Sequence, residues 1–124
     1  MHKWVIKAAA NGQFRTQFVY NSEVMVWSEN YTAKASAKNC IDSMKKNAPD
    51  APTVDRTADE EGKGYRFEIK KTKADEFMVT FIAVNGEAMV SSEGYSSKAS
   101  AKNCIESIKK NGPGAPTEDE TATA

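Results

Sequence analysis

The sequence contains very few histidine and cysteine residues, the side chains that most often serve as catalytic bases, nucleophiles and transition-metal ligands. Its 124 residues include one histidine, His2, and two cysteines, Cys40 and Cys104. No Cys-x-x-Cys or His-x-x-x-His pair is present, so we predict no transition-metal site and no cofactor. A Ser-His-Asp or Cys-His arrangement would depend on a single histidine close to a terminus. We therefore predict that the protein is not an enzyme.

The sequence also lacks an excess of charge and a long apolar run. Lys plus Arg equals Asp plus Glu, at 17 each, whereas strong polyanion binders usually carry an excess of basic residues. No apolar segment approaches the roughly 20 residues that span a bilayer, and the first residues lack the apolar stretch of a secretion signal. Two cysteines are few for a disulfide-stabilised secreted domain. We predict a cytoplasmic protein without membrane contact, with two buried thiols or, as the alternative, one Cys40–Cys104 bridge.

The sequence does contain an internal duplication. Residues 21–53 and 85–117 share about two thirds of their residues, and the longest identical run, residues 34–41, recurs at 98–105. One half, at roughly 60 residues, would bury too little surface to be more than marginally stable alone. We therefore predict one domain over residues 1–117, built from repeat 1 (about 1–60) and repeat 2 (about 61–117). The acidic residues 118–124 are predicted to be a disordered tail.

Each repeat has the pattern of three strands, a helix and a short final strand. In repeat 1, alternating apolar residues predict strands around Trp4 and Ile6, over 14–20 and over 24–28, and a fourth strand is possible at 53–56. Repeat 2 shows the same pattern around Phe67 and Ile69, over 77–83 and over 88–92. One extra residue in the second hairpin of repeat 2, which contains Asn85-Gly86, moves the offset between the repeats from 63 to 64.

The helix is marked by an apolar stripe with helical spacing. In repeat 1 the stripe consists of Ala37, Cys40, Ile41 and Met44, and in repeat 2 of Ala101, Cys104, Ile105 and Ile108. The spacing i, i+3, i+4, i+7 places each set on one side of a helix. We predict that both stripes pack on the sheet.

Lysines beside the apolar stripes form one candidate interaction surface. The residues are Lys34, Lys38 and Lys45, repeated as Lys98, Lys102 and Lys109. Two such edges could bind phosphates of a nucleic acid or another polyanion. Asp42 and Glu106 lie four residues from neighbouring lysines and could neutralise them locally instead.

Trp27 and two Ser-Glu-x-Tyr segments are the other candidates. Trp27 aligns with Ser91, so it is either an aromatic on the solvated side of the sheet that meets a partner or part of an asymmetric core. The two segments place Glu29 with Tyr31 and Glu93 with Tyr95 between the third strand and the helix. They could line a junction pocket, or the tyrosines could close the core while the glutamates pair with a lysine or the helix start.

Several short segments together resemble the YegP-like family of small bacterial and archaeal proteins of unknown function. They are Gln13-Phe14-Arg15, Asn85-Gly86-Glu87, Ser92-Glu93-x-Tyr95, and the helix Ala101-x-x-Cys104-Ile105-x-Ser107-Ile108-Lys109-x-Asn111 after Lys98. The resemblance covers nearly the whole chain. It implies an α+β fold in which a tandem β-β-β-α-β unit forms one antiparallel sheet carrying two helices, with C-terminal strands exchanged between repeats. The family commonly has Gly where this chain has Cys40 and Cys104.

These observations predict a small protein that binds another molecule rather than a catalyst. The resemblance adds no catalytic residue, because none is established for the family. We expect a pseudo-twofold monomer whose sheet presents a surface to an unknown protein or small ligand. Polyanion binding by the paired lysine edges is the alternative.

Overall fold

The computed structural model describes residues 1–121, and these form two similar units. Repeat 1 contains β1 (His2–Ala8), β2 (Phe14–Tyr20), β3 (Glu23–Trp27), α1 (Lys34–Asn47) and β4 (Thr53–Asp55). Repeat 2 contains β5 (Arg66–Lys71), β6 (Phe77–Ile82), β7 (Ala88–Ser91), α2 (Lys98–Asn111) and β8 (Thr117–Asp119). Both repeats therefore have the predicted β-β-β-α-β order.

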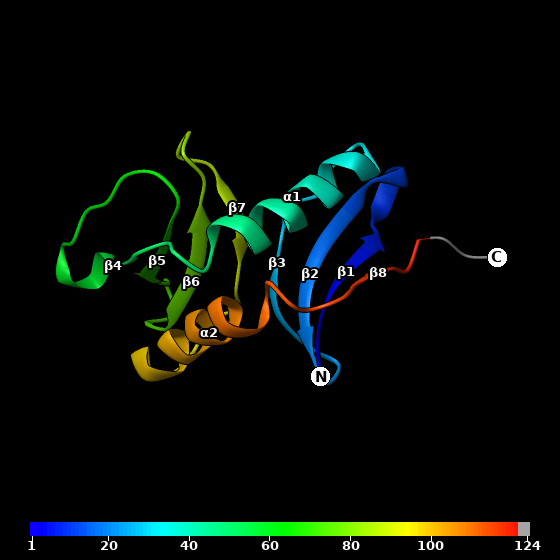
Figure 1. Ribbon diagram of the computed structural model, residues 1–124. Helices are drawn as coiled ribbons and strands as arrows, with labels where there is room; N and C mark the ends of the chain where they lie inside the picture. Colours follow the sequence, from blue (N-terminus) through cyan, green and yellow to red (C-terminus); the bar gives the residue numbers. More distant parts are fainter. Residues whose placement is uncertain (122–124) are drawn as a thin grey trace.

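All eight strands belong to one sheet with the order β4-β5-β6-β7-β3-β2-β1-β8 (Figure 1). β4 pairs with β5 and β8 pairs with β1, so each repeat gives its last strand to the other, as the family resemblance implies. These two pairings are parallel, and the other pairings are antiparallel. The sheet is therefore mixed and not wholly antiparallel. Because β4 and β5 are parallel, residues 56–65 return the chain to the end of the sheet where β4 begins, and β5 starts there.

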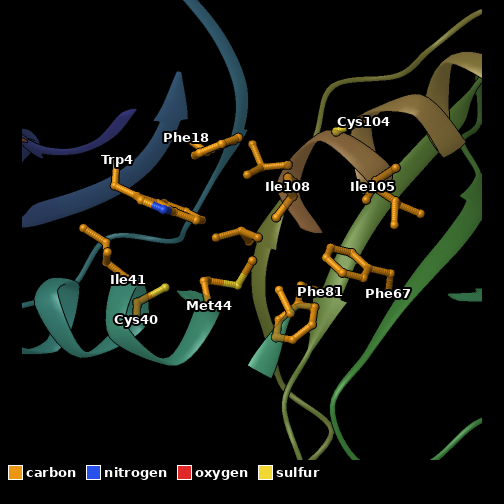
Figure 2. Close-up of a cluster of buried hydrophobic side chains, with 14 of the residues drawn as sticks. Trp4, Phe18, Cys40, Ile41, Met44, Phe67, Phe81, Cys104, Ile105 and Ile108 are labelled. Carbon is orange, nitrogen blue, oxygen red and sulfur yellow. The ribbon is translucent and has the colours of Figure 1, made fainter. Parts of the chain in front are cut away.

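Both helices cover the same face of the sheet, and their apolar stripes are buried as predicted (Figures 1 and 2). The side chains of Ile41 and Ile105 are each only 1% exposed. They belong to one cluster that also contains Trp4 and Phe18 from repeat 1 and inner residues of repeat 2. The Trp4 indole N–H donates to the carbonyl of Gly112 at 2.9 Å, which ties β1 to the end of α2. A shared core thus joins the repeats.

The two thiols are buried and unbridged, which is the favoured one of the two predicted states. Cys40 and Cys104 lie on opposite sides of the buried cluster in Figure 2. Burial raises the pKa of both thiols above the ordinary value of 9.0, so they are protonated at neutral pH. A buried, protonated thiol is a poor nucleophile.

The prediction of a disordered tail is wrong for the first residues of that segment. Glu118 and Asp119 belong to β8, and the Glu120 N–H donates to the carbonyl of Ile6 at 3.0 Å. Acidic side chains hold this edge strand in place because each one meets a lysine. The ion pairs are Lys3–Glu118 at 2.7 Å, Lys34–Asp119 at 3.0 Å and Lys7–Glu120 at 3.1 Å. Residues 122–124 of the predicted tail lie outside the described residues.

The hairpins between the second and third strands differ in length, as the shift in offset predicts. In repeat 1, Asn21 and Ser22 form a two-residue turn with φ values of 47° and 77°. In repeat 2 the loop is longer by one residue, and Gly86 takes the positive φ of 87°. A two-residue hairpin with two positive φ angles and a three-residue loop with a left-handed glycine are both common connections. No helix within residues 1–121 is long and apolar enough to cross a membrane.

Candidate functional site

Two of the six predicted surface lysines hold the exchanged strands. Lys34 of α1 pairs with Asp119 of β8 at 3.0 Å, and Lys98 of α2 pairs with Asp55 of β4 at 2.8 Å. The pKa of Asp55 is lowered to about 2, chiefly by Lys98 and then by Thr57. The pKa of Asp119 is also lowered to about 2, chiefly by Thr121 and then by Lys34. Each lysine thus binds an aspartate that belongs to the other repeat.

The remaining lysines are spread over two separate regions. Lys45 donates to the Thr117 hydroxyl at 3.3 Å, and the Lys109 ammonium lies 5.9 Å from the centre of the Phe67 ring. Lys38 and Lys102 are exposed. The aspartates bound by Lys34 and Lys98 lie on β8 and β4, the opposite edges of the sheet. The lysines therefore do not form one continuous basic patch.

The predicted junction residues are only partly brought together. Tyr31 and Tyr95 are half-buried, with their phenol groups near the thiols of Cys40 and Cys104, and burial raises the pKa of both phenols. Their backbones pair with Phe14 and Phe77. Glu29 and Glu93 are exposed. A hollow of about 240 Å³ lies beside Tyr95, but the carboxylate that lines it belongs to Glu23 and not to Glu93.

The face of the sheet opposite the helices, here called the outer face, is where the repeats differ. Cross-strand pairing aligns one residue from every strand in a row on this face. The row reads Val54, Glu68, Thr80, Ser91, Trp27, Gln17, Val5, Glu118 from one edge to the other. Trp27 thus belongs to the outer face and not to the core.

In repeat 2 the outer face is filled by a charge network. Glu68 is 5% exposed and lies between Arg66, at 2.7 Å, and Lys70, at 3.4 Å. Burial opposes ionisation of Glu68, but hydrogen bonds from Arg66 and Lys70 outweigh this effect and lower its pKa. The loop at Gly62 packs closely against Val54 and Arg66. This region is therefore closed by its own side chains.

In repeat 1 the same region is hollow and has an apolar floor. Val5 occupies the position of Glu68, and with Val19 and Val24 it lines a hollow of about 390 Å³. A second hollow of about 310 Å³ shares Lys7 and Gln17 with the first one. The Gln17 side-chain oxygen is buried and has no hydrogen-bond partner among residues 1–121. Unpaired buried acceptors are uncommon in folded proteins, and each needs an explanation.

Two cations face each other at the edge of these hollows. Lys7 of β1 and Arg15 of β2 are direct cross-strand partners and line the second hollow together. Like charges placed directly opposite destabilise a sheet. Lys7 is partly neutralised by Glu120, whereas Arg15 donates to the Asn30 side chain at 3.2 Å and forms no ion pair within residues 1–121. Repeat 2 avoids this repulsion, since Lys70 faces Met78 there.

Sequence reasoning missed Lys7, Arg15 and Gln17 as a group. Their proximity depends on the register between β1 and β2, which composition does not reveal. The available signal was the mismatch between repeats, because Arg15 aligns with Met78 and Val5 aligns with Glu68. No group of His, Cys, Asp or Glu side chains suited to a metal ion is found in the described part of the chain.

Comparison with known proteins identifies similar sequences that span one or both repeats. The family described as "Domain of unknown function (DUF1508)" matches residues 9–55 and 73–119. A UPF0339 protein of Bordetella pertussis is 36% identical over 118 residues, which cover 95% of this chain and 95% of the relative. A UPF0339 protein of Agrobacterium fabrum is 63% identical over 57 residues, which cover 46% of this chain and 92% of the relative. That relative is thus about as long as one repeat.

Two solved structures share the fold. The solution NMR structure of yegP from E. coli, a protein of unknown function, has a TM-score of 0.78 and 27% identity, covering 99% of this chain and 96% of that one. The solution NMR structure of a UPF0339 protein from Shewanella oneidensis has a TM-score of 0.77 and 28% identity, covering 95% and 90%. These descriptions name no enzymatic activity, and they confirm the family resemblance.

Proposed function

Since this chain belongs to the DUF1508 family, whose function is unknown, we propose from its own geometry that it binds a small organic anion. The site is the outer face of repeat 1. Arg15 and Lys7 receive the anionic group, and Val5 and Val19 line the part of the site that holds an aliphatic body. Hollows of this size are in the range of small-molecule sites.

The observation that supports this proposal most directly is the opposition of Lys7 and Arg15. A facing pair of cations costs stability unless an anion lies between them. Glu120 offsets the charge of Lys7 only, from 3.1 Å and on the surface. Exposed ion pairs contribute little to stability, so a ligand anion can compete with Glu120. The apolar floor then selects a ligand with an aliphatic part over inorganic anions.

The test is an NMR titration of the whole chain with hexanoate, followed on backbone amides. We expect shifts in β1 and β2, and weaker binding at higher salt because the anion is attracted by exposed charge. The matched probe is 1-hexanol, which has the same chain without the charge. Equal shifts with hexanol would contradict the assignment of Arg15 and Lys7.

Replacing a residue of repeat 1 by its counterpart in repeat 2 tests the proposed site most directly. Arg15→Met reproduces the Lys70–Met78 arrangement and should weaken hexanoate binding about tenfold, the value of one charge-assisted hydrogen bond. Lys63→Met removes a positive charge from an exposed loop of repeat 2 and should leave binding unchanged. If the two variants bind hexanoate equally, the proposed site is wrong.

Polyanion binding by the helix lysines is the second candidate. Its support is the exposure of Lys38 and Lys102, while the ion pairs of Lys34 and Lys98 weaken it. It predicts salt-sensitive retention on heparin that the double variant Lys38→Glu/Lys102→Glu loses. We also propose a cytoplasmic monomer, and the two unbridged thiols support the reducing location.

A further inference from the structure

The hollow of about 240 Å³ beside Tyr95 lies at a seam where the two repeats meet, on the helix-covered side of the molecule. Tyr20, Glu23 and Met25 of repeat 1 line one side, and Tyr95, Asn103 and Cys104 of repeat 2 line the other. This seam hollow shares no lining residue with the hollows of the outer face. It is therefore a separate feature from the proposed anion site.

Two tyrosine rings from different repeats line the seam hollow. Tyr20 is 43% exposed, and its ring packs against the His2 ring with centroids 4.3 Å apart. Tyr95 is half-buried, with its phenol group near the Cys104 thiol. Large exposed aromatic side chains with an ordered backing are typical of binding sites, because they supply contact area at low entropic cost. The His2 ring provides this backing for Tyr20.

The surroundings of the seam hollow are negative. Glu23 lines the hollow, and Glu23 and Glu93 both oppose ionisation of the Tyr95 phenol, adding to the effect of burial. No Lys or Arg lines the hollow, as far as residues 1–121 are concerned. Burial and the N-terminal amine lower the pKa of His2 below 6.5, so His2 is neutral at physiological pH. A cation entering here meets aromatic rings and carboxylates, and both attract it.

We propose that the seam hollow binds an alkylammonium group. Tyr20 and Tyr95 present aromatic surface to the cation, the Glu23 carboxylate supplies the opposite charge, and Met25 contacts the alkyl chain. An alkylammonium ion fits better than a metal ion, because a single carboxylate and two neutral phenols are a poor set of metal ligands.

The second seam provides an internal comparison. There, Tyr31 packs against Cys40, and Glu29 and Glu87 act on its phenol, as Glu93 and Glu23 act on Tyr95. The position of Tyr20 is taken by Ala83, so the second aromatic ring is missing. The seam at Tyr95 should therefore bind the cation more tightly than the seam at Tyr31.

The experiment is an NMR titration of the full chain with n-pentylammonium, and with 1-pentanol as the uncharged probe. We expect pentylammonium to shift the amides of Tyr95 and Cys104, and pentanol to have little effect. A parallel titration with N-acetyl-lysine N-methylamide tests a protein side chain as the source of the ammonium group. Binding of either amine supports the proposal and distinguishes the two sources. If neither amine shifts these amides, or if pentanol acts like the amine, the proposal is overturned.

Variants distinguish binding in the seam hollow from non-specific electrostatic attraction of the cation to the protein surface. Tyr20→Ala copies Ala83 of the other repeat and should weaken pentylammonium binding about tenfold. The matched control is Val84→Ala, which trims an exposed side chain in the equivalent hairpin. Glu23→Gln should also weaken binding, and Glu87→Gln should not. These variants alter exposed residues, so their folding can be checked from amide dispersion. Equal affinities for Tyr20→Ala and Val84→Ala would overturn the proposal.

Discussion

The two repeats have closely similar residues on the inner face of the sheet and on the helices that cover it, but different residues on the outer face. Cys40, Ile41 and Ala37 have identical counterparts in α2, and all six side chains are buried in the same cluster. On the outer face, Val5, Gln17 and Trp27 align with Glu68, Thr80 and Ser91. No member of this second set is retained between the repeats.

The difference follows from what each face must do. The inner faces meet in one core, where a change in volume of even one methylene is felt by neighbours from both repeats. The outer faces share no such core, because each repeat covers its own part of this face separately. In the middle of the sheet, β3 and β7 join the repeats through the single register pair Trp27–Ser91. The other sheet pairings between the repeats are those of the exchanged strands, β4 with β5 and β8 with β1. The core and the exchanged strands therefore provide most of the contact between the halves.

The largest predicted effect tests the equivalence of the inner faces. Ile41→Ala and Ile105→Ala should each lower the free energy of unfolding by about 2–5 kcal/mol, because each leaves a cavity in the core. The two losses should be similar, since both side chains are 1% exposed. Urea denaturation measures both. A loss well under 1 kcal/mol for either one would show that its helix does not pack as described.

A smaller effect is expected at the helix starts, where the repeats differ by one hydroxyl. The Ser97 side chain accepts a hydrogen bond from the Ser100 N–H, and Ala33 occupies the same extended cap position of α1 without such a bond. Ala33→Ser should raise the free energy of unfolding by about 1 kcal/mol, and Ser97→Ala should lower it by a similar amount. Thermal unfolding of both variants measures this. A destabilising Ala33→Ser would mean that the two caps are not equivalent.

A change of similar or smaller size is expected on the outer face of repeat 2. The Thr80 hydroxyl is buried and has no hydrogen-bond partner among the described residues. Thr80→Val keeps the shape and removes the unpaired group, so it should be neutral or stabilise the protein by up to about 1 kcal/mol. Chemical denaturation tests this. Hexanoate binding should be unchanged, because the proposed anion site belongs to repeat 1.

The smallest expected effect concerns the two lysine–aspartate pairs that hold the exchanged strands. Asp55 and Asp119 have folded-state pKa values of about 2, below the ordinary 3.8. A lowered pKa stabilises the fold above the ordinary value, and this contribution is lost as the pH falls from about 4 to about 2. Asp55→Asn and Asp119→Asn should therefore each flatten the acid side of the stability profile.

Denaturant titrations between pH 2 and pH 6 measure this effect, and Asp50→Asn is the control at an exposed aspartate. Asp55→Asn should have the larger influence, because the Asp55 side chain is 15% exposed and that of Asp119 is 28% exposed. An unchanged profile for both variants would mean that the pairs do not stabilise the exchanged strands.

Much of the fold could be predicted from the sequence, but little of the candidate site. The spacing of Ala37, Cys40, Ile41 and Met44 predicts the helix and its buried side, because helical periodicity is local. The prediction for the lysines was less complete. Lys34 and Lys98 were placed on their helices correctly, but their aspartate partners lie in the other repeat and have no local signal in the sequence.

The sequence by itself determined that the protein is a duplication of one strand and helix pattern with a shared core. Identity between the repeats and apolar periodicity can both be recognised from short segments of sequence. Only the tertiary structure decided which residues of the outer face meet. Register between strands places Arg15 opposite Lys7, and strand exchange places Glu120 beside Lys7. Both depend on pairing between distant segments, so the chemistry of this face emerges only when the sheet is assembled.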